Sequence, residues 1–193
     1  MNRALILFAH PCDESFSAAL KTTVVDTLTK RGWEVDLCDL YAEGFDPVLT
    51  AAERRAYLTI PANAAPVQGY VDRLRAADAL VMVFPVWNFG FPAILKGFVD
   101  RVFLPGVSFT LDAGLVAPAL TNIRRMAAVT TYGATRWRAF AAGDPPKRVI
   151  KRALWFVARP DKCRYLALHD MNRVTDEGRR RYLAAVQREM EHF

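Results

Sequence analysis

The side chains best suited to chemistry lie in loops that directly follow apolar runs, and the first such loop carries His10, Ser15 and Ser17. This loop leads into a helical pattern that ends at Gly32. The first turn of a helix has backbone N–H groups without partners, so hydroxyls and an imidazole beside it are suited to hold a phosphate. Two structural alternatives stay open: Ser15 or Ser17 also suits the N-cap of the helix, and a single histidine after a strand is often structural.

Two further loops present flat or small residues instead of charged ones. One follows the apolar run Ala79 to Phe84, and the other ends the run Arg124 to Thr131. Small hydroxyl residues and a glycine at a strand exit let backbone amides approach a planar ligand closely, although a tight turn without a ligand has the same composition. The residues of these loops are Pro85, Val86, Trp87, Asn88 and Phe89, and Thr130, Thr131, Tyr132 and Gly133.

Short apolar segments alternate with helical patterns along the chain, which predicts an α/β doubly wound domain with a flavodoxin-like five-stranded parallel sheet, order 2-1-3-4-5. Ligands of such sheets bind beyond the carboxyl ends of the strands, here where the first two loops face each other. The expected strands are Ala4 to Ala9, Trp33 to Leu40, Ala79 to Phe84, Arg124 to Thr131 and Cys163 to Leu168. Helices are expected between Ser17 and Gly32, over Ala51 to Tyr57 and Val67 to Ala76, after Pro92, and over Lys147 to Val157 and Thr175 to Phe193.

Length and composition narrow the class of protein. The 193 residues, 52% of them hydrophobic, are expected to form one domain over residues 1–193. No apolar run has the length of a membrane span, and no signal peptide is recognised, so we expect a cytoplasmic protein. Cys12, Cys38 and Cys163 show no CxxC or metal-ligand spacing. We therefore expect free thiols and no metal.

The net charge of +6 arises from one segment of the chain. Between Ala134 and Arg164 there are nine basic residues but only two acidic ones, Asp144 and Asp161. A basic segment can serve a nucleic acid, an anionic membrane surface or a phosphorylated ligand. Because no nucleic-acid motif accompanies it, we expect no nucleic-acid partner, and a nucleotide ligand and a plain solvated face both stay open.

A phosphate loop opposite two flat-walled loops suits a flavin. The phosphate would lie at the first helix, and the ring against Trp87, Asn88 and Phe89. The sequence contains neither GxSxG nor HExxH, so the chemistry would belong to the cofactor.

Several segments resemble the flavodoxin-like NAD(P)H:quinone reductases, a DT-diaphorase-like family. The most specific is Phe91 to Phe103, FPAILKGFVDRVF, and the resemblance covers residues 4 to 143. Supporting segments are Leu5 to His10 with Ser15-Phe16, Gly32 to Val35 with Asp39 to Tyr41, and Phe84-Pro85.

The resemblance implies a flavin-dependent homodimer in which NAD(P)H and a small-molecule electron acceptor use one site in turn, by ping-pong hydride transfer. It assigns His10, Ser15, Phe16 and Ser17 to the phosphate. The ring would be held by Pro85, Val86, Trp87, Asn88, Phe89, Thr130, Thr131, Tyr132 and Gly133. The pocket for acceptor and nicotinamide is assigned to Gly133, Phe109 and Trp137.

The chain also departs from the family pattern. Phe109 and Leu111 stand where the family's animal quinone reductases have tyrosines, and Ala142 replaces a histidine before Gly143-Asp144. The supply of a proton to a quinone must therefore differ, or the acceptor is another compound. Residues for the adenine half of FAD cannot be matched, so we expect FMN, with FAD as the alternative.

The nicotinamide donor is expected to be NADPH rather than NADH. Arg136 and Arg138 directly follow the third loop, and guanidinium groups suit a 2′-phosphate. Two other functions stay open: a flavin-bound regulatory subunit of a membrane transporter, with the basic segment as its docking surface, and a flavodoxin-type electron carrier.

Overall fold

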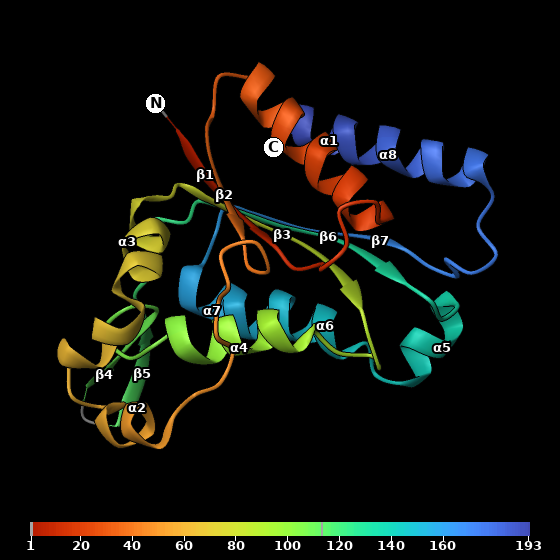
Figure 1. Cartoon of the computed structure of the whole chain (residues 1–193). Helices are drawn as coiled ribbons and strands as arrows, with labels where there is room; N and C mark the ends of the chain where they lie inside the picture. Colours follow the sequence, from red (N-terminus) through yellow and green to blue (C-terminus); the bar gives the residue numbers. More distant parts are fainter. Residues whose placement is uncertain (1, 113) are drawn as a thin grey trace.

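A five-stranded parallel sheet forms the middle of the fold, in the order β2-β1-β3-β6-β7 (Figure 1). The structure, a computed structural model, describes residues 2–112 and 114–193. Counted within this sheet, the order is the predicted 2-1-3-4-5, and the doubly wound α/β fold is confirmed. The strands are β1 (Arg3–Phe8), β2 (Glu34–Asp39), β3 (Ala79–Val86), β6 (Arg125–Tyr132) and β7 (Lys162–Leu168).

The helices agree with the predicted pattern, with two additions. A 3₁₀ helix precedes α3, and a short helix, α5, follows β6 where no element was predicted. The predicted helix over Lys147 to Val157 runs from α6 to α7, with a π-helical middle. The helices are α1 (Phe16–Lys30), α2 (Ala51–Ala56), η1 (Ala62–Val67), α3 (Gln68–Ala76), α4 (Ala93–Val102), α5 (Arg136–Ala141), α6 (Pro145–Arg148), η2 (Val149–Leu154), α7 (Trp155–Ala158) and α8 (Asp176–Glu191).

Helices cover both faces of the sheet. In Figure 1, α1 and α8 lie side by side on one face, and α3, α4, α6 and α7 lie on the other. Strand β1 shows why both layers form, because its side chains alternate between the two hydrophobic cores: Leu5 and Leu7 pack toward one, and Ile6 and Phe8 toward the other. The carboxyl ends of the strands stay uncovered by these layers, so the loops that leave them can form a site.

A β-hairpin outside the central sheet was not predicted. Strands β4 (Phe109–Asp112) and β5 (Leu115–Pro118) pair antiparallel beside α2 in Figure 1. In the part of the chain described here, no helix combines the length and apolar character of a membrane span.

The segment from Tyr41 to Pro66 is held against the rest of the protein by contacts with α4. Arg101 of α4 bonds to Glu53, with the Nη2–Oε1 atoms 2.5 Å apart, and also donates to the carbonyl oxygen of Asp46. Gly97, one helical turn earlier, packs so closely against Pro47 that a Cβ atom there would overlap the Pro47 backbone. The glycine of the FPAILKG sequence is thus needed for contact between α4 and this segment.

Replacing Gly97 with alanine tests this contact. We expect Gly97→Ala to lower the free energy of unfolding by about 1–3 kcal/mol, because the Pro47 backbone must move to admit the methyl group. Urea denaturation measures the change. Gly69→Ala is the matched control, since nothing lies within 4 Å of a Cβ at this helical glycine. Equal stabilities of the two variants would contradict the assigned role of Gly97.

Candidate functional site

The loop after β1 prepares His10 as a hydrogen-bond donor. The backbone N–H of Cys12 donates to Nδ1 of His10, with 3.0 Å between the nitrogens. A neutral imidazole whose Nδ1 accepts a bond carries its proton on Nε2. The edge of the His10 ring meets Trp87 at a centroid distance of 5.8 Å, which links this loop to the loop after β3.

The first turn of α1 supplies further donors. Ser15 is the N-cap, and its hydroxyl oxygen accepts from the N–H of Ala18 at 3.1 Å. The preceding N–H groups, of Phe16 and Ser17, cannot bond within the helix. Since α1 has 15 residues and no acidic residue in its first turn, the positive end of its dipole is not offset there. Of the two serines that the sequence suggests as the N-cap, the structure has Ser15 in that position, beside N–H groups that also suit a phosphate.

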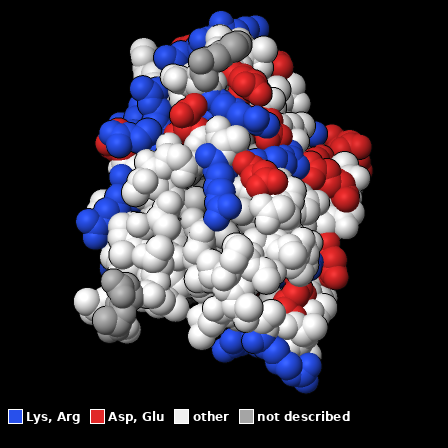
Figure 2. All heavy atoms as spheres, turned by 90° about the vertical axis from the view of Figure 1, so that its left-hand side faces the viewer, with Lys and Arg blue, Asp and Glu red and all other residues white. Residues whose placement is uncertain are grey.

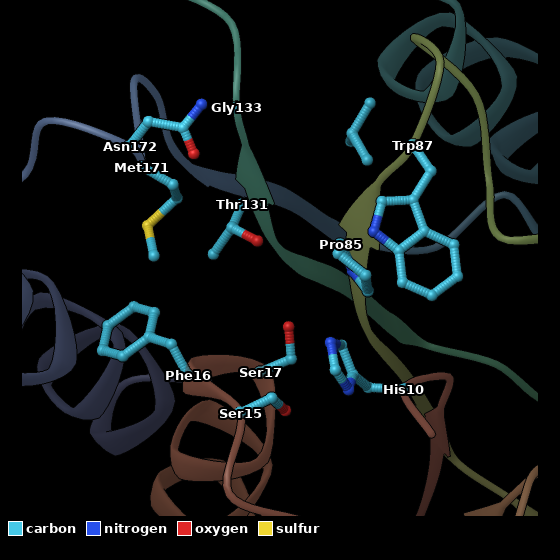
Figure 3. Close-up of a pocket in the computed structure, with 11 residues that line it drawn as sticks. His10, Ser15, Phe16, Ser17, Pro85, Trp87, Thr131, Gly133, Met171 and Asn172 are labelled. Atoms are coloured by element: carbon cyan, nitrogen blue, oxygen red, sulfur yellow. The ribbon is translucent and has the colours of Figure 1, made fainter. Parts of the chain in front are cut away.

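These donors face a cavity of about 310 Å³ at the carboxyl edge of the sheet. In Figure 3, His10 and Ser17 lie on one side of the cavity, and Thr131 and Asn172 lie across from them. None of the described residues that line it is acidic. The lining consists of His10, Ser15, Phe16, Ser17, Pro85, Val86, Trp87, Thr131, Gly133, Met171 and Asn172. Such a cavity favours an anion over a cation.

A second cavity, of about 200 Å³, adjoins the first, because Val86 and Gly133 line both. Its other lining residues are Asn88, Phe89, Tyr132 and Ala134. Gly133 leaves this wall open, since a Cβ atom there would meet only the Asn172 amide, at 3.8 Å. A planar group can therefore approach the backbone at Gly133.

The loop after β3, which forms part of the lining of the second cavity, is a tight turn. Trp87 and Gly90 exchange two backbone hydrogen bonds, with N–O distances of 3.2 and 2.8 Å. The two central residues, Asn88 and Phe89, both have positive φ, at 48° and 58°. This combination is typical of a type I′ turn, in which a phenylalanine is unusual and strained. The turn places the Phe89 side chain in the lining of the second cavity.

A buried hydrogen-bond network stands behind the second cavity. The Tyr132 hydroxyl donates to Asp144 Oδ1 at 2.5 Å, and it accepts from the Tyr165 hydroxyl at 2.5 Å. Burial, followed by the Asp144 carboxylate, raises the pKa of Tyr132 above its ordinary value. Burial likewise raises the pKa of Tyr165, so both groups stay protonated and serve as fixed donors. The network ties the end of β6 to the turn after α5.

The ring of His169 packs against the ring of Tyr132. The two rings stack with centroids 4.5 Å apart and an angle of 17° between their planes. Burial lowers the pKa of His169; Asp144 opposes this shift, whereas Arg136 and Lys147 add to it. His169 is thus held neutral to lower pH than a free histidine, beside the wall of the site.

The lowered pKa of His169 makes stability depend on pH. As the pH falls through about 6.5, the unfolded chain binds this proton more readily than the folded chain does, so the free energy of unfolding should fall. We expect His169→Gln to reduce that fall between about pH 7.5 and pH 5.5. Urea denaturation at several pH values measures it, and an unchanged slope in the variant would refute the assigned protonation state.

The structure brings most of the predicted site residues together. All four predicted phosphate residues and all five residues of the second loop line one of the two cavities, as do Thr131, Tyr132 and Gly133. Thr130 does not, because its side chain is fully buried in β6 and its hydroxyl has no partner. Phe109 lies on the β4–β5 hairpin, and Trp137 on α5, and neither lines these cavities. Arg136 and Arg138 are exposed on α5.

Sequence reasoning missed Met171 and Asn172, which follow β7. The backbone N–H of Met171 donates to the Tyr132 carbonyl oxygen at 3.0 Å, and this bond draws the loop after β7 to the cavity. The predicted strand order could have indicated these residues. The loop that leaves the strand next to β6 must lie at the same edge of the sheet as the loop after β6.

Comparison with known proteins gives three kinds of match. The family described as having a flavodoxin-like fold matches residues 2–188. NAD(P)H dehydrogenase (quinone) 1 of Cavia porcellus is 34% identical over 149 residues, covering 69% of this chain and 54% of that protein. The uncharacterized NAD(P)H oxidoreductase YcaK of Escherichia coli is 32% identical over 173 residues, which cover 87% of this chain and 80% of that protein. The crystal structure of Smu.1420 from Streptococcus mutans UA159 superposes with a TM-score of 0.87 and 29% identity. The superposition covers 99% of this chain and 100% of that chain.

The lengths of these relatives differ. The chain spans about half the length of the first of these curated relatives, but most of the length of the second. Their names confirm the resemblance to NAD(P)H:quinone reductases. Since the match extends over residues 2–188, the chain belongs to the flavodoxin-like fold family.

Proposed function

We propose that this protein is a flavin-dependent NAD(P)H oxidoreductase that reduces a quinone or a similar electrophile. The observation that carries the proposal is the junction of two cavities at the carboxyl edge of the sheet, one lined by anion-binding groups and one by flat walls. When bound, the flavin supplies the redox chemistry: it accepts hydride from NAD(P)H and passes it to the acceptor. The names of the curated relatives support the same activity.

The phosphate of the flavin is proposed to bind in the first cavity. The N–H groups of Phe16 and Ser17, the Ser17 hydroxyl and Nε2 of His10 are its donors, and a phosphate is among the anions that such a helix terminus binds. No carboxylate among the described lining residues opposes it. We propose FMN rather than FAD, because one phosphate and one ring suffice to use both cavities.

The ring of the flavin is proposed to lie in the second cavity. Asn88 and Phe89 of the tight turn would contact one side of it, and the backbone at Gly133 and Ala134 would contact another. Fixed backbone amides at this wall would stabilise the negative charge that a reduced flavin gains. We further propose that NAD(P)H and the acceptor bind over the same open part of the ring in turn, in a ping-pong reaction, with NADPH preferred over NADH.

We also propose a homodimer. Figure 2 views the side on which α2, β4 and β5 lie, and a broad uncharged area there has the charged residues mostly around it. Exposed apolar side chains of these elements and of the neighbouring loops are Val48, Leu58, Ile60, Leu111, Leu115 and Val116. An apolar area of this kind is suited to contact between protein chains. A cytoplasmic location is proposed as well, in agreement with the free cysteines.

An absorption spectrum followed by anaerobic addition of NADPH tests the function. We expect the purified protein to show flavin bands that bleach with NADPH and return when a quinone is added. A protein that binds neither FMN nor FAD after reconstitution would contradict the proposal. A flavin that NADPH leaves oxidised would favour an electron carrier or a regulatory subunit.

A further inference from the structure

A third cavity, of about 290 Å³, lies between the end of α5 and the helix that begins with α6. Four basic side chains line it, Lys147, Arg148, Lys151 and Arg152, and none of them belongs to the two cavities described above. The remaining lining residues are Phe140, Gly143 and Asp144.

The positive charge of this basic cavity is balanced only in part by the protein, because its lining has four basic side chains and one carboxylate. Lys147 and Lys151, like Arg148 and Arg152, are four residues apart, where like charges on a helix repel each other. In the described part of the chain, none of the four forms a salt bridge, whereas Arg73 and Arg101 elsewhere do. Asp144, the one carboxylate in the lining, accepts a hydrogen bond from Tyr132. An anionic ligand would therefore remove a repulsion that the folded chain otherwise retains.

The helix that carries these side chains is irregular at this place. Between Val149 and Leu154, the segment η2, it is a π-helix, a rare form that is frequent at functional sites. Lys151 and Arg152 belong to this stretch, and Lys147 and Arg148 to the turn before it. The wider π turn and the cavity thus coincide with the basic cluster.

An exposed aromatic pair lies at the rim of the basic cavity. Phe140 lines the cavity and is 69% exposed, and it stacks on Trp137, which is 72% exposed, with ring centroids 5.6 Å apart. Large aromatic side chains with so little cover are suited to stack on a flat partner. Beside four cations, the partner that this pair suits is the base of a nucleotide.

The basic cavity is close to the proposed ring site. Tyr132 lines the ring cavity, and its hydroxyl bonds to Asp144, which lines the basic cavity. The six residues of α5 rise about 9 Å between the two. A dinucleotide that extends along α5 can therefore reach both cavities at once.

We propose that the basic cavity binds the 2′-phosphate of NADPH, with the adenine against Phe140 and Trp137. Arg148 and Arg152 are its principal ligands, and Arg136 and Arg138 lie along the path of the dinucleotide. This assignment rests on the proposed function and names the part of the donor that is recognised.

The test measures binding of adenosine 2′,5′-bisphosphate and of AMP to the full chain by titration calorimetry, which requires no turnover. We expect the bisphosphate to bind at least about tenfold more tightly than AMP, because its second phosphate gains charge-assisted hydrogen bonds. R148Q/R152Q should abolish that difference without loss of folding, since it also removes a like-charge pair. R180Q/R188Q, two exposed arginines of α8 on the opposite face of the sheet, is the control with the same change in charge.

Kinetics separate this proposal from the proposed function. R148Q/R152Q should lower the ratio of kcat/KM for NADPH to that for NADH by a larger factor than Arg136→Ala does. An unchanged ratio, or bisphosphate affinity equal to wild type, would overturn the assignment even if NADPH still reduces the flavin. Tighter binding of a short single-stranded oligonucleotide through Arg148 and Arg152 would overturn it as well. A protein that binds the bisphosphate in this way but is not reduced by NADPH would instead refute the proposed function.

Discussion

Parallel pairing of the five strands is the constraint on which the site depends. It brings the carboxyl ends of β1, β3, β6 and β7 to one edge, although their exit loops are far apart in the sequence. At that edge α1 begins, and its first N–H groups have no partner within the helix. The fold therefore places free N–H donors, which suit an anion, where its first helix begins, and His10 and Ser17 line the cavity that these donors face.

The walls around that site are held in place by interactions that do not touch a ligand. The turn from Trp87 to Gly90 keeps two left-handed residues, a strain of about 1–3 kcal/mol for each, which the two hydrogen bonds across the turn help to offset. Tyr132 is held by Asp144 and Tyr165 at its hydroxyl and by His169 at its ring. These contacts prepare a rigid wall before any planar group arrives, which lowers the cost of binding one.

Local sequence signals were sufficient for the central sheet, for most of the helices and for the first loop of the site. Alternation, caps and glycines are short-range properties, so the five strands of the central sheet could be predicted, as could a cap at Ser15 or Ser17, of which the structure has Ser15. Four residues of the same predicted loop, His10, Ser15, Phe16 and Ser17, line the first cavity. The side chain of Thr130 is buried, whereas that of Thr131 lines the cavity, because successive side chains of a strand point to opposite faces. The position of Met171 and the Tyr132 network arise from contacts between residues far apart in the sequence, which no local pattern encodes. The π-helix within the basic segment also left no signal in the spacing of its residues.

Binding of a flavin phosphate at the first turn of α1 is tested most directly by comparing the affinities of FMN and riboflavin. The two share the ring and differ in the phosphate, so the difference isolates this end of the site. We expect FMN to bind at least about a hundredfold more tightly, and Ser17→Ala with His10→Ala to reduce that ratio while riboflavin binding stays the same. Equal affinities of the wild-type protein for FMN and riboflavin would show that the first cavity does not hold the phosphate.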